Sequence, residues 1–100
     1  GTTPAHIAAH QGHTAALALL VEAGCDVDKA KQDGATPVYI AAWQGQTAAL
    51  ELLAEAGCDV NQAMEDGRTP AYAAAQRGQT AALELLVKSG CDVNLADEDG

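Results

Sequence analysis

The chain has 100 residues; 48% of them are hydrophobic but only 3% are aromatic, so Ala and Leu must supply most of a modest core. Five Lys and Arg against fourteen Asp and Glu give a formal net charge of −9. This charge repels phosphate backbones and anionic lipids, so we expect neither a nucleic-acid partner nor a membrane partner.

The first predicted element is a short helix over residues 4–11. Thr3 is a suitable N-cap because its hydroxyl can accept a backbone N–H bond, and Pro4 suits the first helical position because its φ is fixed. We expect Gly12 to end this helix.

A second helix is predicted directly afterwards, in the segment AALALLVEA, residues 15–23. We expect Thr14 to be its N-cap and Gly24 to end it in the left-handed conformation. The equivalent caps of the later helices are Thr47 and Thr80. Spacing of 3.6 residues per turn predicts one apolar face. That face contains Ala16, Leu17, Leu20 and Val21.

A polar stretch follows the second helix and ends in Asp33-Gly34. Asp-Gly is a strong turn signal, so we expect a hairpin-like projection at this point. The chain then begins the same pattern again.

These elements recur every 33 residues, which indicates three tandem units at residues 1–33, 34–66 and 67–99 of one domain spanning residues 1–100. The last two units are identical at 23 of 33 positions without a gap. Two short helices cannot bury their apolar faces alone, so the units should stack. The Thr-Pro pairs begin at Thr3, Thr36 and Thr69, the helix-ending glycines are Gly12, Gly45 and Gly78, and the Gly-Cys-Asp-Val segments begin at Gly24, Gly57 and Gly90.

The shared frame resembles the ankyrin repeat: Asp-Gly-x-Thr-Pro, Ala-Ala-x-x-Gly, Leu-Leu, then Gly-x-Asp-Val-Asn. The resemblance covers the whole chain. It implies an all-α solenoid of stacked antiparallel helix pairs joined by hairpin-like turns, and a role in protein recognition. The chain departs from the usual repeat at two positions. The usual Leu-His after Thr-Pro is Ala5-His6 in the first unit and Val38-Tyr39 in the second. A Cys follows the glycine after each second helix.

Three histidines raise the question of a metal site. His6 and His10 lie four residues apart, a spacing that lets two imidazoles share a metal ion, and His13 follows. Tyr39 and Tyr72 occupy the position of His6 in the other units, however, and no Glu follows His6 as a metalloprotease motif requires. We therefore favour scaffold roles and expect no metal and no cofactor.

Cys25, Cys58 and Cys91 recur at one position of the frame. Stacked helices are about 8 to 10 Å apart, whereas a disulfide needs Cα atoms within about 7 Å. We expect three free thiols in buried small-residue positions. Free thiols and the lack of a visible targeting signal favour an intracellular, cytoplasmic protein.

No catalytic arrangement is evident, since the sequence has no Gly-rich phosphate loop and Ser89 is its only serine. We expect carboxylates such as Glu51 and Glu84 to lie at exposed helix positions, where contact with water accounts for a charged side chain without a catalytic role. We therefore expect no enzyme activity.

The resemblance implies that a protein partner binds to the turn tips and to the concave side of the first helices. Trp43 is the central residue of this prediction, because Trp and Arg often dominate interface energies; partial packing of Trp43 against its neighbours is the alternative. The predicted partner-binding residues are Lys31, Gln32, Ala35, Met64, Glu65 and Arg68 on the turns, and His10, Gln11, Trp43, Gln44, Gln76 and Arg77 on the helices.

The ends of the array suggest a different role. Terminal repeats usually carry a polar outer face, whereas the first and last units here keep the apolar pattern of the middle one. The alternatives are a segment of a longer array, an engineered repeat scaffold without a natural ligand, and a homo-oligomer formed by end-to-end stacking. The near-identity of the units favours engineering among these.

Overall fold

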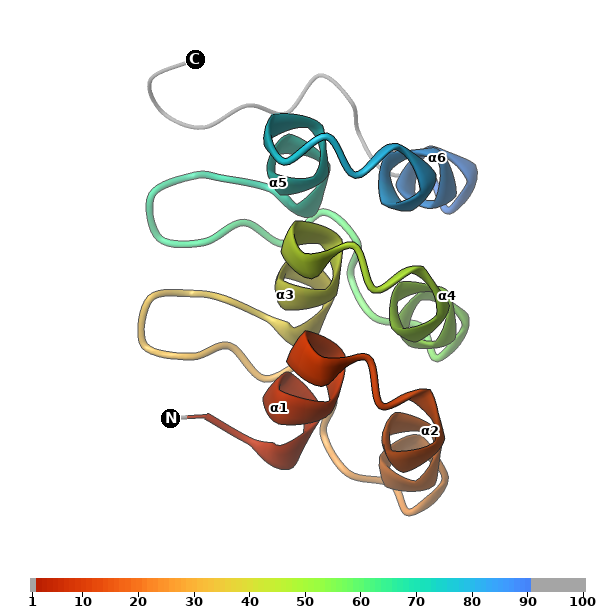
Figure 1. The fold of residues 1–100 in the computed structure, drawn as a ribbon. Helices are drawn as coiled ribbons and strands as arrows, with labels where there is room; N and C mark the ends of the chain where they lie inside the picture. The colour runs from red at the N-terminus through yellow and green to blue at the C-terminus, as the bar shows by residue number, and fades with distance from the viewer. Residues whose placement is uncertain (1, 91–100) are drawn as a thin grey trace.

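A computed structural model describes residues 2–90 of the chain. This part contains six helices in three antiparallel pairs and no strand (Figure 1). The helices are α1 (Pro4–Gln11), α2 (Thr14–Glu22), α3 (Pro37–Gln44), α4 (Thr47–Glu55), α5 (Pro70–Gln76) and α6 (Thr80–Lys88). The all-α prediction of stacked helix pairs is confirmed.

The first helix of each pair begins as predicted. The hydroxyl oxygens of Thr3, Thr36 and Thr69 each accept a bond from the backbone N–H three residues later, and a proline occupies the first turn. Gly12 and Gly45 end α1 and α3 with a φ of 73°, a left-handed conformation that glycine adopts without steric cost.

The predicted caps of the second helices were wrong. Thr14, Thr47 and Thr80 are the first helical residues of α2, α4 and α6, and no side chain caps these helices. The turn after the glycine is so tight that one residue, His13 in the first pair, fills the cap position. The Thr14 hydroxyl instead donates to the carbonyl of Gly12 at 3.4 Å.

The helices form two layers (Figure 1). In one layer α3 packs between α1 and α5, and in the other α4 packs between α2 and α6. The loops that connect successive pairs project from the α1, α3 and α5 layer, away from α2, α4 and α6. Each pair therefore contacts only its neighbours, as expected of a solenoid.

The connecting loops end in tight turns that stack on each other. In the first, the Lys31 N–H donates to the Ala35 carbonyl at 2.8 Å; in the second, the Glu65 N–H donates across to the Asp33 carbonyl at 3.0 Å. Gly34 has a φ of 90°, and a Cβ there would lie 2.6 Å from the Glu65 nitrogen. The predicted Asp-Gly turn therefore also serves as a contact between units.

The core lies between the two layers and consists mainly of Ala and Leu. Leu17, Leu50, Leu53 and Leu86 are fully buried. Burying such a side chain contributes about 1.5–3 kcal/mol each. Ala16 was predicted in the core but is exposed, because no described unit covers the outer side of α2. No helix within residues 2–90 combines the length and apolar character needed to cross a membrane.

Glutamine side chains link successive pairs. Gln46 donates through Nε2 to the carbonyl of His10 at 3.0 Å, and Gln79 donates to the carbonyl of Trp43 at 3.2 Å. Carbonyls in the last turn of a helix lack a partner within it, and these bonds supply one. They fix the register of each unit on the next.

Candidate binding groove

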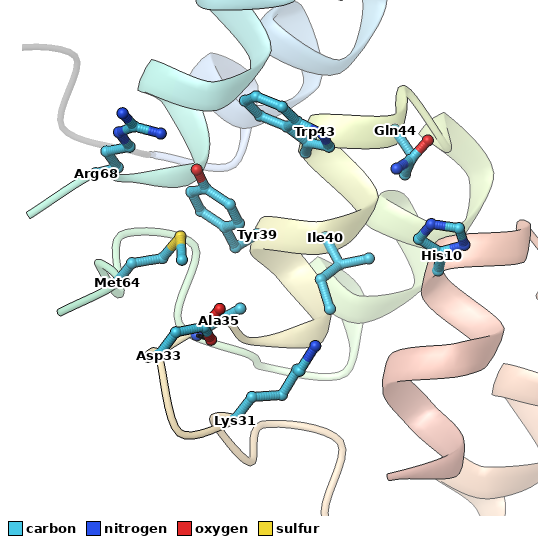
Figure 2. A pocket seen from close by; sticks show the side chains of 10 residues that line it. All are labelled: His10, Lys31, Asp33, Ala35, Tyr39, Ile40, Trp43, Gln44, Met64 and Arg68. Carbon is cyan, nitrogen blue, oxygen red and sulfur yellow. Dashed lines mark hydrogen bonds between the residues drawn. The ribbon is translucent and has the colours of Figure 1, made fainter. Parts of the chain in front are cut away.

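A groove of about 360 Å³ lies where the turns meet the layer of first helices. We call it the concave groove. Its floor comes from α3, one wall from α1, and the other from the turns before α3 and α5 (Figure 2). It is lined by His10, Lys31, Asp33, Ala35, Tyr39, Ile40, Trp43, Gln44, Met64 and Arg68.

Aromatic rings and guanidinium groups contact one another in and beside this groove. The rings of Tyr39 and Trp43 stack with centroids 6.5 Å apart and an interplanar angle of 13°. Arg77 places its guanidinium carbon 4.6 Å from the centroid of Trp43, and Arg68 lies 5.8 Å from that of Tyr72. Such cation–π contacts hold flexible Arg side chains in place.

The side chains around these groups leave part of them accessible. Trp43 is half-buried and Arg77 is exposed. Figure 2 shows Arg68 near the hydroxyl end of Tyr39, and the amino group of Lys31 pointing toward Ile40. Trp43 therefore packs against its neighbours and also remains open to a ligand.

The structure brings most of the predicted partner-binding residues to one place. Arg77 adjoins the groove through Trp43, and Gln11 lines an adjacent hollow beside His10. Gln32, Glu65 and Gln76 lie outside the groove and are exposed. Seven of the predicted residues line it directly: His10, Lys31, Ala35, Trp43, Gln44, Met64 and Arg68.

Sequence reasoning missed three lining residues, namely Asp33, Tyr39 and Ile40. Tyr39 recurs as Tyr72, so a comparison of the units does not distinguish it from the repeat framework. Asp33 belongs to the Asp-Gly turn signal, which does not indicate a role in binding. Ile40 could have been found from the sequence, because the equivalent residue of the next unit is Ala73.

Burial and charge alter two groups in the groove. Burial raises the pKa of Tyr39, and the positive charge of Arg68 partly opposes that rise. Asp66, whose carboxylate lies 3.3 Å from the Arg68 Nε, raises the pKa of Arg68. Tyr39 is therefore a neutral hydroxyl, and Arg68 a permanent cation, at neutral pH.

His6 lies beneath the turn rather than in a metal site. Its ring is buried; Nδ1 lies 3.0 Å from the Thr3 backbone nitrogen, and Nε2 lies 3.0 Å from the Ala35 carbonyl oxygen. Because a carbonyl only accepts, Nε2 carries the proton and Nδ1 accepts from Thr3. Both nitrogens are occupied, so His6 cannot share a metal ion with His10.

The cysteines differ in environment although they share a position in the frame. Cys58 is buried, and this burial, reinforced by Asp28, raises its pKa to about 12. Cys25 is a free thiol and exposed, so the prediction of burial was wrong for it, because no described unit covers that side of the first pair. Cys91 lies outside the described residues.

The geometry supports binding by contact and charge. In residues 2–90 no three His, Cys, Asp or Glu side chains gather closely enough to hold a metal ion. The groove offers flat apolar faces and cationic N–H donors, which suit a peptide or protein surface.

Comparisons with known proteins agree with the repeat pattern. A family model described as "Ankyrin repeats (3 copies)" matches residues 1–64, and one described as "Ankyrin repeat" matches residues 66–98. No curated protein matches the chain.

Proposed function

Because the chain belongs to the ankyrin repeat family, whose repeats are generally protein–protein interaction modules, we propose that it is a non-catalytic binding module that holds a protein partner in the concave groove. The turns at Lys31 and Met64 form one rim, and His10 and Gln44 lie on the helical side. The partner would contact α1, α3 and the two turns together.

The observation that carries this proposal is the arrangement of stacked rings and a guanidinium group at Trp43. A solvent-accessible Trp between Tyr39 and Arg77 is unusual in a chain with so few aromatic residues. Trp, Tyr and Arg are the residue types most enriched among those that dominate binding energy.

The test is capture of partners by immobilised protein, comparing wild type with Trp43→Ala. We expect the variant to fold and to lose about 2 kcal/mol or more of binding energy, roughly 30-fold in Kd. Val87→Ala is the matched control, since Val87 is an exposed apolar residue on α6, outside the groove. Mass spectrometry identifies the partner, and circular dichroism checks the fold. Equal binding by wild type and Trp43→Ala would contradict the proposal.

A second candidate function is end-to-end association, in which copies of an engineered scaffold stack without any other ligand. The outer side of the first pair is apolar: Ile7 is 55% exposed and Leu19 is 66% exposed. They line a hollow of about 430 Å³ with Pro4, Ala8, His13, Ala16 and Leu20. In the next pair, the residues equivalent to Pro4 and Ala16 are buried by the preceding unit.

Light scattering over a concentration series tests this second candidate. We expect wild type to increase in mass with concentration and the double variant Ile7→Gln, Leu19→Gln to remain a monomer, because the substitutions remove the apolar contact. Trp43→Ala is the control that leaves this end intact. A monomeric wild type at the highest concentration would rule the candidate out.

We propose in addition that the protein works in a reducing, intracellular compartment. The exposed Cys25 supports this, because a free thiol on the surface is oxidised in secretory environments.

A further inference from the structure

Negative charge is distributed unequally between the two layers of helices in the described chain. Helices α1, α3 and α5 contain no Asp or Glu. Helices α2, α4 and α6 carry four Glu side chains, with Lys88 as their only Lys or Arg. The negative charge of the helices thus lies on the layer that faces away from the groove.

The scarce positive charges gather at the concave groove. Of the five Lys and Arg in the chain, Lys31 and Arg68 line it and Arg77 stacks on its Trp43. Within residues 2–90 only one ion pair forms, between Arg68 and Asp66. Lys31 and Arg77 therefore have no carboxylate partner in the described chain.

The guanidinium carbon of Arg77 lies 4.6 Å from the centroid of the Trp43 ring, and the side chain is exposed. A guanidinium that lies over a ring uses its flat face, which leaves its N–H edge for a bidentate bond to a carboxylate. The position of Arg77 over Trp43 is compatible with this arrangement. A carboxylate placed there could lie beside an apolar side chain on the exposed part of Trp43.

The carboxylates at the rim are already engaged. Asp33 accepts the Ala35 N–H at 3.0 Å through Oδ1, and Asp66 accepts the Arg68 N–H in the same way while its second oxygen pairs with the Arg68 side chain. Glu65 is exposed at the turn tip, outside the groove. Asp33 keeps its negative charge, because one N–H bond does not neutralise it, and Lys31 and Arg77 are the cations near the groove without a carboxylate partner in residues 2–90.

We infer that the partner segment is acidic: it brings carboxylates to Arg77 and Lys31 and an apolar side chain to Tyr39, Ile40 and Trp43. This inference rests on the proposed function of the groove. At physiological salt the Debye length is about 8 Å, so the carboxylates on the far layer are largely screened from the ligand. A short acidic segment is therefore attracted, whereas a long polyanion would meet the net charge of −9.

The test uses synthetic peptides of one length. The acidic probe repeats Glu-Glu-Leu, and its counterparts carry Gln or Lys in place of each Glu. Anisotropy of a dye on the peptide gives Kd, and emission from Trp43, the only Trp in the chain, reports whether the peptide lies in the groove. We expect the acidic peptide to bind about tenfold or more tightly than either counterpart.

Charge-neutralising variants locate the contact. Arg77→Gln and Lys31→Gln should each raise the Kd of the acidic peptide about tenfold, because each variant loses one charge-assisted bond. Lys88→Gln changes net charge equally on the other layer and should leave Kd unchanged. Raising the salt to about 1 M, where the Debye length is about 3 Å, should weaken binding further.

Three results would overturn the inference: equal binding of the acidic and Gln peptides, tighter binding of the Lys peptide, or comparable binding of a short oligothymidylate. The proposed function is judged separately. A captured partner that is lost with Trp43→Ala but retained by Arg77→Gln at high salt would leave the groove as a binding site and show that its partner is not acidic.

Discussion

Single positions of the repeat frame perform different tasks in different units. Position 6 is the clearest case: His6 bonds through both ring nitrogens under the turn, whereas Tyr39, its equivalent, lies in the groove and stacks on Trp43. The side chain at this position either fastens the turn or lines the binding surface. The frame fixes where the side chain lies, and its chemistry decides what it does.

His6 should make stability depend on pH. Burial lowers the pKa of His6 below its ordinary value of 6.5, although its bond to the Ala35 carbonyl partly opposes this. As pH falls through 6.5 the unfolded chain binds the proton first, and this favours unfolding. The stabilisation is therefore complete above pH 6.5 and is lost progressively as the pH drops toward the lower folded value.

Thermal unfolding followed by circular dichroism between about pH 7.5 and 5.5 checks this expectation. The Tm of the wild type should fall as the pH is lowered across this range. The Tm of His6→Gln should fall less, because the substitution removes the titrating ring. His13→Gln, at an exposed histidine, is the matched control. A wild-type Tm that stays constant or rises as the pH falls would show the sign to be wrong.

At the level of elements, the two helices of each pair start by different means. The first helices have a threonine cap and a proline in their first turn, whereas the second helices begin straight from the glycine turn without a side-chain cap. Tertiary contacts must therefore stabilise the second helices, since isolated helices of nine residues are marginal in water.

A pair of threonine substitutions distinguishes the capped start of a first helix from the uncapped start of a second helix. Thr36→Ala removes the hydroxyl that accepts the Tyr39 N–H at 3.1 Å and should cost about 1 kcal/mol, with a range of roughly 0.5–2. Thr47→Ala removes only a long contact of 3.4 Å to Gly45 and should cost less than about 0.5 kcal/mol. Urea unfolding measures both, and equal costs would contradict the assignment of caps.

In the whole molecule, stacking determines which apolar residues are buried. Leu53 and Leu86 are 0% exposed, while Leu20, at the same position of the first unit, is only partly buried. The frame is the same in all three units. The difference arises because no described unit packs on the outer side of the first pair.

Substituting equivalent leucines measures this effect directly. Leu53→Ala should cost about 2–5 kcal/mol of unfolding free energy, because it leaves a cavity between units. Leu20→Ala should cost clearly less, because water reaches its site. Urea unfolding compares the two, and equal losses would show that the outer side of the first pair is covered in solution.

Much of this architecture was predictable because each local signal agreed with the next. The Thr-Pro starts, the helix-ending Gly12 and Gly45 and the Asp33-Gly34 turn form where the pattern indicated, whereas α5 ends at Gln76 with Arg77 rather than Gly78 at the cap position. The caps at Thr14 and Thr47 failed because a cap depends on the conformation of the preceding turn, which residue type alone does not determine. Burial of Ala16 and Cys25 failed because it requires a neighbouring unit.

The sequence by itself determined the repeat, the helices and the stacking of the units, since these follow from short-range patterns of turns and apolar spacing. The tertiary structure added Asp33, Tyr39 and Ile40 to the predicted lining and decided which side chains of the groove contact one another. Tyr39 and Trp43 come from the second unit, Arg68 and Arg77 from the third, and Lys31 from the turn at the end of the first. Which side chains meet across a stack depends on register and on the side-chain directions of separate units, and no single segment encodes that.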